Sequence, residues 1–303
     1  MKAAPSDVAA PDRKEWISWL LLWVGVLSAS SSAILIRYAD GAEPLAISFW
    51  RSAAGSLALL PFAMRGLGRM RVEQFKLPVI AGVFLAIHFA TWIASLEKTT
   101  IAESVLLVTT TPIFTALGAR WLWNERLGRA GWTGIGFALV GTAVIASGGI
   151  GQGSSSLTGD ALALSGGIAI AGYAMAGQIS RRELGILQYA VVTYGAGALL
   201  LLVVCLIGGV PLLGYEAPTW WALAGIIIGP QLMGHTIINL VLRDLGATTV
   251  SVAVMAETII AIILAWLIFH EAPTLLVYPG GLAILLGIYL TSGARRASVE
   301  LPG

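Results

Sequence analysis

Ten apolar segments, each close to the length of a membrane-spanning helix, follow one another along the chain with short polar connections. A helix needs about 20 residues to cross the hydrocarbon core of a bilayer, where its backbone polar groups must be satisfied internally. We therefore predict an all-α, polytopic membrane protein with ten transmembrane helices. The predicted spans are roughly 16–36, 45–64, 77–96, 102–122, 130–147, 158–180, 186–208, 219–240, 247–269 and 274–292.

The low content of charged residues supports this interpretation. Charged residues make up 11% of the chain, against roughly 25% in an ordinary soluble domain. A soluble protein with so few charges could not cover its apolar core with a polar shell. Because the predicted helices take up most of the 303 residues, we expect no separate soluble domain.

Sequence signals of several other functions are absent. There is no basic tract of the kind that follows a phosphate backbone, so nucleic acid is not an expected partner. Neither a Gly-x-x-x-x-Gly-Lys-Ser/Thr loop for ATP nor a His-Glu-x-x-His metal motif occurs. We therefore expect no cofactor, no metal and no catalytic residues. The expected partners are the lipid bilayer and a small-molecule substrate, and a monomer is the simplest oligomeric state.

The basic residues indicate the orientation of the helices. Ten spans place both termini on one side, and that side receives most of the 18 Lys and Arg residues. Because cytoplasmic connections carry such an excess, both termini are predicted to be cytoplasmic in a bacterial inner membrane. The opposite side receives only Arg37 and Lys98. The residues on the basic side are Lys2, Arg13, Lys14, Arg65, Arg69, Arg71, Lys76, Arg120, Arg126, Arg129, Arg181, Arg182, Arg243, Arg295 and Arg296.

The second half of the chain repeats features of the first. Five spans in each half would insert the two halves with opposite orientation, which is a recurrent plan of secondary transporters. The two halves can then exchange conformations and open a path to either side, although a duplicated bundle without transport is the alternative. The matching pairs, each 146 residues apart, are Glu125 and Glu271, Gly134 and Gly280, and Gly141 and Gly287.

A Gly- and Ser-rich segment between the fifth and sixth spans reads as a linker between the two halves. The predicted organisation is a cytoplasmic leader 1–15, a first five-helix repeat 16–147, a periplasmic linker 148–157, a second five-helix repeat 158–292 and a cytoplasmic tail 293–303.

Two blocks of the first half resemble the EamA type of the drug/metabolite transporter superfamily. They are AISFWRSAAG at residues 46–55, and the stretch from Ala102-Glu-Ser-Val through Thr111-Pro112 to Trp123-Asn124-Glu125-Arg126-Leu127. The second half departs from the pattern, since Glu257-Thr258 stands where the Thr-Pro pair would be. The resemblance implies two inverted five-helix repeats around a central cavity and the export of amino acids or other metabolites. Within the superfamily the chain looks most like the YddG-type aromatic amino acid exporters.

Polar side chains within two spans are the main candidates for a substrate cavity. His88, Trp92 and Ser95 share one face of the third span because they are spaced by four and three residues. The eighth span carries a second stripe at spacings of four. Polar groups that persist inside a membrane generally face a cavity or the bundle interior, although interhelical hydrogen bonding is the alternative. The second stripe consists of Gln231, His235 and Asn239.

Two charged residues away from the span ends are further candidates. Glu257 lies near the middle of the ninth span, and the repeat places it opposite Thr111. Its carboxylate could bind a substrate ammonium, carry a proton, or pair with His235 or Arg51. The guanidinium of Arg51, next to Trp50 in the second span, suits a substrate carboxylate. A structural pairing or snorkelling towards the periplasm is the alternative for Arg51.

Three further residues complete the candidate set. Pro112 interrupts the fourth span and could act as a hinge during gating, although many membrane helices tolerate Pro without moving. Because Pro112 has no N–H, one backbone carbonyl of the preceding turn loses its hydrogen bond. We expect a Thr hydroxyl to donate to that carbonyl. Tyr173 and Gln178 in the sixth span could join the cavity wall.

The sequence thus predicts a secondary-type transporter that exports small metabolites, with aromatic or other apolar amino acids as the first choice. A multidrug or nucleotide-sugar carrier of the same fold is the alternative within transport. An intramembrane enzyme that uses His88, His235 and Glu257 is the alternative from another class. Energy would come from the substrate gradient or from coupled ions.

Overall fold

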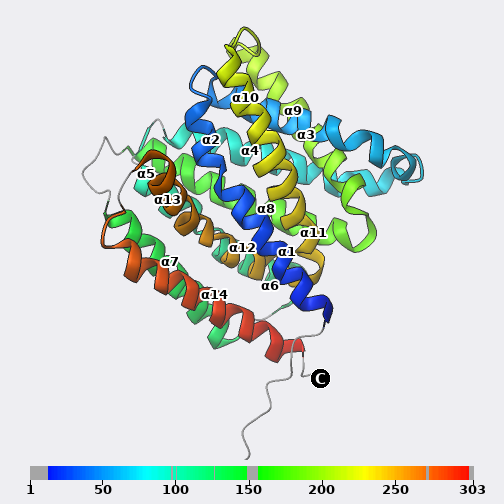
Figure 1. Ribbon diagram of the computed structural model, residues 1–303. Coiled ribbons are helices and arrows are strands. Elements are labelled where there is room, and N and C mark those ends of the chain that lie inside the picture. Colours follow the sequence, from blue (N-terminus) through cyan, green and yellow to red (C-terminus); the bar gives the residue numbers. More distant parts are fainter. Residues whose placement is uncertain are drawn as a thin grey trace, which may run out of the picture.

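The structure is a computed structural model that describes residues 13–96, 98–99, 101–125, 127–148, 156–270 and 273–299. Every regular element in these ranges is helical (Figure 1), which confirms the prediction of an all-α chain. Within these residues nine helical segments are long and apolar enough to cross a membrane, and the shorter apolar helix Val277–Gly293 follows them. The ten predicted spans therefore all correspond to helical segments.

The elements of the first half are α1 (Arg13–Ser30), α2 (Ser32–Tyr38), α3 (Pro44–Leu67), the 3-10 turn η1 (Val72–Phe75), α4 (Lys76–Leu96), α5 (Ile101–Val108), α6 (Thr111–Trp123) and α7 (Arg129–Ser147). Those of the second half are α8 (Leu157–Glu183), α9 (Ile186–Gly208), α10 (Ala217–Ile226), the π-helical segment η2 (Ile227–His235), α11 (Thr236–Leu245), α12 (Ala247–Val254), α13 (Ala256–Phe269) and α14 (Val277–Val299).

The fourth predicted span is divided into two consecutive helices, α5 and α6. Pro112 lies in the first turn of α6, where its missing N–H costs nothing. The hydroxyl of Thr111 donates to the carbonyl of Val108 at 2.7 Å. That carbonyl is the acceptor that Pro112, four residues further along, cannot use. The expected compensation by a Thr hydroxyl is therefore present.

The ninth span is interrupted at the equivalent place, between α12 and α13 at Met255. The two divided spans, α5–α6 and α12–α13, also end in the same backbone conformation. Asn124 after α6 has a φ of 55° and His270 after α13 has a φ of 57°, and in the described part of the chain no other non-Gly residue has a positive φ. These two left-handed residues are 146 residues apart, which is the shift found in the sequence.

Helices α7 and α14 pack against one another along one side of the molecule (Figure 1). A Cβ atom on Gly141 would lie 2.4 Å from the carbonyl oxygen of Gly280, and one on Gly287 would lie 2.5 Å from that of Gly134. Only glycine allows the two backbones to approach so closely. A shift of 146 residues takes Gly141 to Gly287 and Gly134 to Gly280. The two contacts are therefore equivalent, and the pairing of α7 with α14 is symmetric.

The remaining helices interleave the two halves of the chain. From the first half, α3 packs against α9, α4 packs against α8 and α9, and α1 packs against η2 and α11. Polar side chains from both halves therefore meet in the middle of the bundle. Helix α1 begins, and α14 ends, at the same end of the molecule (Figure 1), as an even number of crossings requires.

Candidate transport site

Arg51 of α3 is the most deeply buried charged side chain in the bundle interior, with an exposed fraction of 2%. Its Nε donates to Oε1 of Gln231 in η2 at 2.9 Å, and one Nη donates to Ser32 at 3.5 Å. Its Cζ lies 4.2 Å above the ring centroid of Phe89. Among the described residues, no carboxylate lies within the 4.0 Å that defines an ion pair with Arg51.

Small residues of α3 make room for this arrangement. Ser48, Ser52 and Gly55 lie on the buried face of the helix that also carries Arg51. A Cβ on Gly55 would lie 2.9 Å from the Cγ of Gln231. The sequence therefore places a large guanidinium among small neighbours, which lets η2 approach and pair with it.

Aromatic rings form a wall beside Arg51. The rings of His88 and Trp92 are stacked, with centroids 5.7 Å apart and an interplanar angle of 7°, so these two side chains lie on one face of α4. Nδ1 of His88 lies 3.0 Å from the carbonyl oxygen of Gly166 in α8. Phe89 meets the ring of His235 edge to face at 5.7 Å. These contacts join α4, α8 and η2.

Tyr173 and Asn239 extend this cluster towards α8 and α11. Nδ2 of Asn239 donates to the hydroxyl of Tyr173 and, at 2.6 Å, to the carbonyl of His235. The ring of Tyr173 lies 6.2 Å from that of His235. The hydroxyls of Tyr194 in α9 and Thr236 in α11 are hydrogen-bonded at 3.0 Å.

Sequence reasoning did not identify Phe89, Tyr194 or Thr236 as members of this cluster. Phe89 is apolar and therefore gives no polar signal within its span. Tyr194 was detectable as a tyrosine far from either end of the seventh span, because a deep hydroxyl needs a partner. We define the central cluster as Arg51, His88, Phe89, Trp92, Tyr173, Tyr194, Gln231, His235, Thr236 and Asn239.

Three buried polar atoms of the central cluster have no hydrogen-bond partner among the described residues. They are Nε2 of Gln231, Oδ1 of Asn239 and Nε1 of Trp92. A buried polar atom without a partner costs roughly 1–3 kcal/mol. Such atoms are uncommon in folded proteins, so together they point to a place where a polar ligand could supply the missing hydrogen bonds.

Glu257 lies in the first turn of α13 and is half-buried. Arg51 is the opposite charge that acts on its carboxylate. Within the described chain, however, Glu257 makes no hydrogen bond or ion pair, so the expected pairing with His235 or Arg51 is not formed in this conformation. Its carboxylate is thus available to another group.

Four other candidates join helices outside the central cluster. Ser95 is hydrogen-bonded to Ser104 at 2.6 Å, and Thr111 donates to the carbonyl of Gly167 at 3.2 Å. Two more form contacts near the ends of spans. Oε1 of Gln178 accepts from the backbone N–H of Ala247 at 2.8 Å, and Nε1 of Trp50 donates to the carbonyl of Leu212 at 2.8 Å.

Two of the cavities formed by the described residues lie elsewhere in the structure. One, of about 700 Å³, is an apolar groove along α9 bordered by α3 and α4. The other, of about 440 Å³, lies between the segments 38–41 and 214–219. No residue of the central cluster lines either cavity. The central cluster therefore lies apart from these two cavities.

Comparisons with known proteins agree with this architecture. The chain matches the EamA-like transporter family twice, at residues 16–147 and 157–293. It is 28% identical over 261 residues to the uncharacterized transporter YdfC of Bacillus subtilis (strain 168), and the aligned region covers 83% of each chain. A riboflavin transporter of Rhizobium johnstonii is 33% identical over 99 residues, which are 32% of this chain and 33% of that one.

Solved structures with the same fold include one that matches nearly the whole chain. Its TM-score is 0.79 at 19% sequence identity, and the match covers 93% of this chain and 99% of that chain. At this identity the likeness concerns the fold alone. The assignment of a family rests instead on the two sequence matches, which together cover most of the residues. The chain therefore belongs to the EamA-like transporter family.

Proposed function

We propose that this transporter exports amino acids with aromatic or other apolar side chains across a bacterial inner membrane, from the cytoplasm outwards. One observation carries the choice of cargo: a buried guanidinium, that of Arg51, lies among aromatic rings without a carboxylate partner in the described chain. A guanidinium binds a carboxylate through two parallel hydrogen bonds. The adjacent rings suit an apolar side chain.

The proposed binding mode uses the atoms that lack partners. The cargo carboxylate would bind Arg51 and the free Nε2 of Gln231. The aromatic side chain would pack against Phe89 and the stacked pair of His88 and Trp92. The cargo ammonium would approach Glu257, whose carboxylate makes no hydrogen bond or ion pair within the described residues.

The proposed mechanism is alternating access. The central cluster draws residues from both halves, so a relative movement of the halves would open it towards either side. The interruptions at Thr109-Thr110 and at Met255 divide equivalent spans, and a stacked pair of helices can bend there more easily than a continuous one. Pro112 would then act within the first of these two hinges. The free energy would come from the cargo gradient or from a coupled ion.

Two alternatives receive less support. Riboflavin, the cargo named for one partial relative, has no carboxylate and would leave Arg51 uncompensated, as would most neutral drugs. A nucleotide sugar would need more cations than Arg51 alone. An intramembrane enzyme using His88, His235 and Glu257 is disfavoured by the family and by the transporter names of the relatives.

Counterflow in proteoliposomes tests this function. Vesicles loaded with unlabelled phenylalanine are expected to accumulate external labelled phenylalanine transiently and without chemical change. Riboflavin and a UDP-sugar serve as competing cargoes in the same assay. Accumulation of riboflavin but of no amino acid would identify riboflavin as the cargo and contradict the proposal. Recovery of a chemically modified product would identify an enzyme.

Replacing Glu257 by Gln is expected to lower the rate of counterflow by about tenfold or more. The substitution removes the carboxylate that faces the cargo ammonium, and a hydrogen bond to a charged group contributes roughly 1.5–3 kcal/mol. The dependence of the rate on pH should also change if Glu257 carries a proton. Glu216→Gln is the matched control, because Glu216 is exposed in the connection before α10. A Glu257→Gln protein that transports at the wild-type rate at every pH would exclude this role.

A further inference from the structure

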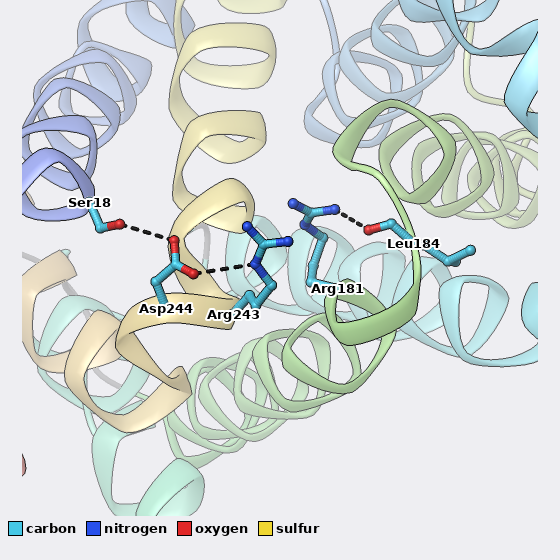
Figure 2. Close-up of polar contacts among 5 residues, drawn as sticks. All are labelled: Ser18, Arg181, Leu184, Arg243 and Asp244. Carbon is cyan, nitrogen blue, oxygen red and sulfur yellow. Dashed lines mark hydrogen bonds and ion pairs between the residues drawn. The ribbon is translucent and has the colours of Figure 1, made fainter. Parts of the chain in front are cut away.

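A second polar site lies at the end of the molecule where α1 begins, away from the central cluster. Figure 2 shows Arg181 from the last turn of α8, together with Arg243 and Asp244 from the last turn of α11. Ser18 of α1 completes the group by donating to Oδ2 of Asp244 at 3.0 Å. Three spans that are distant in the sequence therefore meet at this point.

Arg181 is only partly satisfied by the protein. Its exposed fraction is 3%, and one Nη donates to the carbonyl of Leu184 at the end of α8. This contact is what a basic residue in a last helical turn ordinarily makes. Its Nε is buried and has no hydrogen-bond partner in the described chain. A guanidinium carries five N–H donors, so most of the hydrogen-bonding capacity of Arg181 is not used by the protein.

A second guanidinium, that of Arg243, faces Arg181 (Figure 2). The positive charges of the two residues repel one another. Asp244 offsets one of them by pairing with Nε of Arg243 at 3.3 Å, on the side away from Arg181. Among Arg181, Arg243 and Asp244, one positive charge is therefore left over. Two like charges close together in a partly buried site destabilise one another, and an anion bound between them would relieve this repulsion.

The start of α9 adds to the positive potential. Leu184, whose carbonyl binds Arg181, is followed after Gly185 by the first residue of α9, Ile186. A helix begins with free N–H groups and the positive end of its dipole. The carboxyl ends of α8 and α11 act in the opposite sense, but at the end of α8 the carbonyl of Leu184 already accepts a hydrogen bond from Arg181.

We propose that Arg181 and Arg243 form a binding site for an oxyanion, a carboxylate or a phosphate group, at this end of the bundle. The bound group would bridge the two guanidiniums and accept a hydrogen bond from the buried Nε–H of Arg181. It would thereby hold α8, α11 and the α8–α9 connection together at what we predict to be the cytoplasmic face. A soluble anion from the cytoplasm and the phosphate of a membrane lipid share this chemistry. The site does not depend on the cargo proposed above.

The test is the thermal stability of the full-length protein in nanodiscs of phosphatidylcholine. Inorganic phosphate is added in one arm, against sodium chloride of equal ionic strength, and part of the lipid is replaced by phosphatidylglycerol in the other. We expect at least one arm to raise the Tm of the wild-type protein by about 2–4 °C at several times the Kd. A response to phosphate identifies a soluble anion, and a response to phosphatidylglycerol alone identifies a lipid headgroup.

Arg181→Gln and Arg243→Gln should each abolish the shift, whereas Arg182→Gln should retain it. Arg182 is the matched control, because it is the next residue along α8 but is exposed and lies over the ring of Trp123. If Arg181→Gln does not fold, Arg243→Gln decides the question, since the Arg243 side chain is 54% exposed. The proposal is overturned if neither arm stabilises the wild-type protein, or if Arg182→Gln loses the shift to the same extent as Arg243→Gln.

Discussion

Replacing Arg51 by Met is expected to reduce the counterflow of phenylalanine about a hundredfold, with the protein still inserted in the membrane. Met keeps an apolar stem of similar length over Phe89 but removes the guanidinium that would bind the cargo carboxylate. Truncating one partner of a buried, hydrogen-bonded charge pair costs roughly 2–5 kcal/mol. Since about 1.4 kcal/mol corresponds to tenfold in affinity, a hundredfold loss lies within this range. Initial rates measured over a range of phenylalanine concentrations provide the test.

Two comparisons separate recognition of the carboxylate from damage to the fold. Arg37→Met removes a guanidinium that stacks on Phe269 near the end of α2, outside the central cluster, and should transport normally. Phenylalaninamide, which lacks the carboxylate, should compete weakly against phenylalanine in the wild-type protein. In Arg51→Met this preference for the acid over the amide should disappear. A mutant that transports slowly but still prefers the acid would contradict the proposed role of Arg51.

The spans of this protein are predictable from the sequence because lipid imposes a single requirement on every one of them. Each backbone must satisfy its own hydrogen bonds over the thickness of the bilayer, and apolar runs report this directly. The breaks inside the spans follow less simply. Pro112 indicates the break between α5 and α6, whereas no proline marks the equivalent break at Met255. A structural alignment of the two halves would have placed this second break opposite the first.

The predicted repeat is supported at the glycines of α7 and α14 and by the left-handed residues Asn124 and His270. Glu271, one of the residues on which the repeat was based, lies outside the described residues, as does most of the predicted linker at 149–155. The same holds for most of the predicted leader and for the last residues of the tail. The proposed boundaries between the halves therefore remain predictions.

The candidate site was predictable in its members but not in its contacts. Spacing alone placed His88 and Trp92 on one face, and their rings are stacked. Spacing also placed Gln231 and His235 in one stripe, but the π-helical turn of η2 directs them to different partners. The hydrogen bond between Arg51 and Gln231 joins residues 180 positions apart. Such a contact depends on how the two halves pack, which no local pattern reports. Whether these residues line a transport cavity remains a prediction.

Replacing Gly141 by Leu is expected to lower the Tm of the protein in detergent by about 5–10 °C. The first side-chain atom would lie 2.4 Å from the carbonyl oxygen of Gly280, which belongs to the backbone of α14 and cannot rotate away. Overpacking a well-packed interior costs about 1–3 kcal/mol, and a rigid backbone neighbour places this substitution at the upper end. Each kcal/mol corresponds to about 2–4 °C in a protein of somewhat smaller size.

Gly136→Leu on the same helix is the matched control, and it separates the effect of packing on the Tm from the effect of helix propensity. Outside the local backbone of α7 and the two neighbouring residues, no described atom lies within 4 Å of a Cβ built at Gly136. Leu favours a helix over Gly by roughly 1 kcal/mol, so this substitution should leave the Tm unchanged or raise it slightly. The same gain is present at residue 141 but is outweighed by the clash with α14. If both substitutions raised the Tm, the close contact of α7 with α14 would be wrong. If Gly280→Leu lowered it as much as Gly141→Leu, the symmetric pairing of the two helices would be supported from its other side.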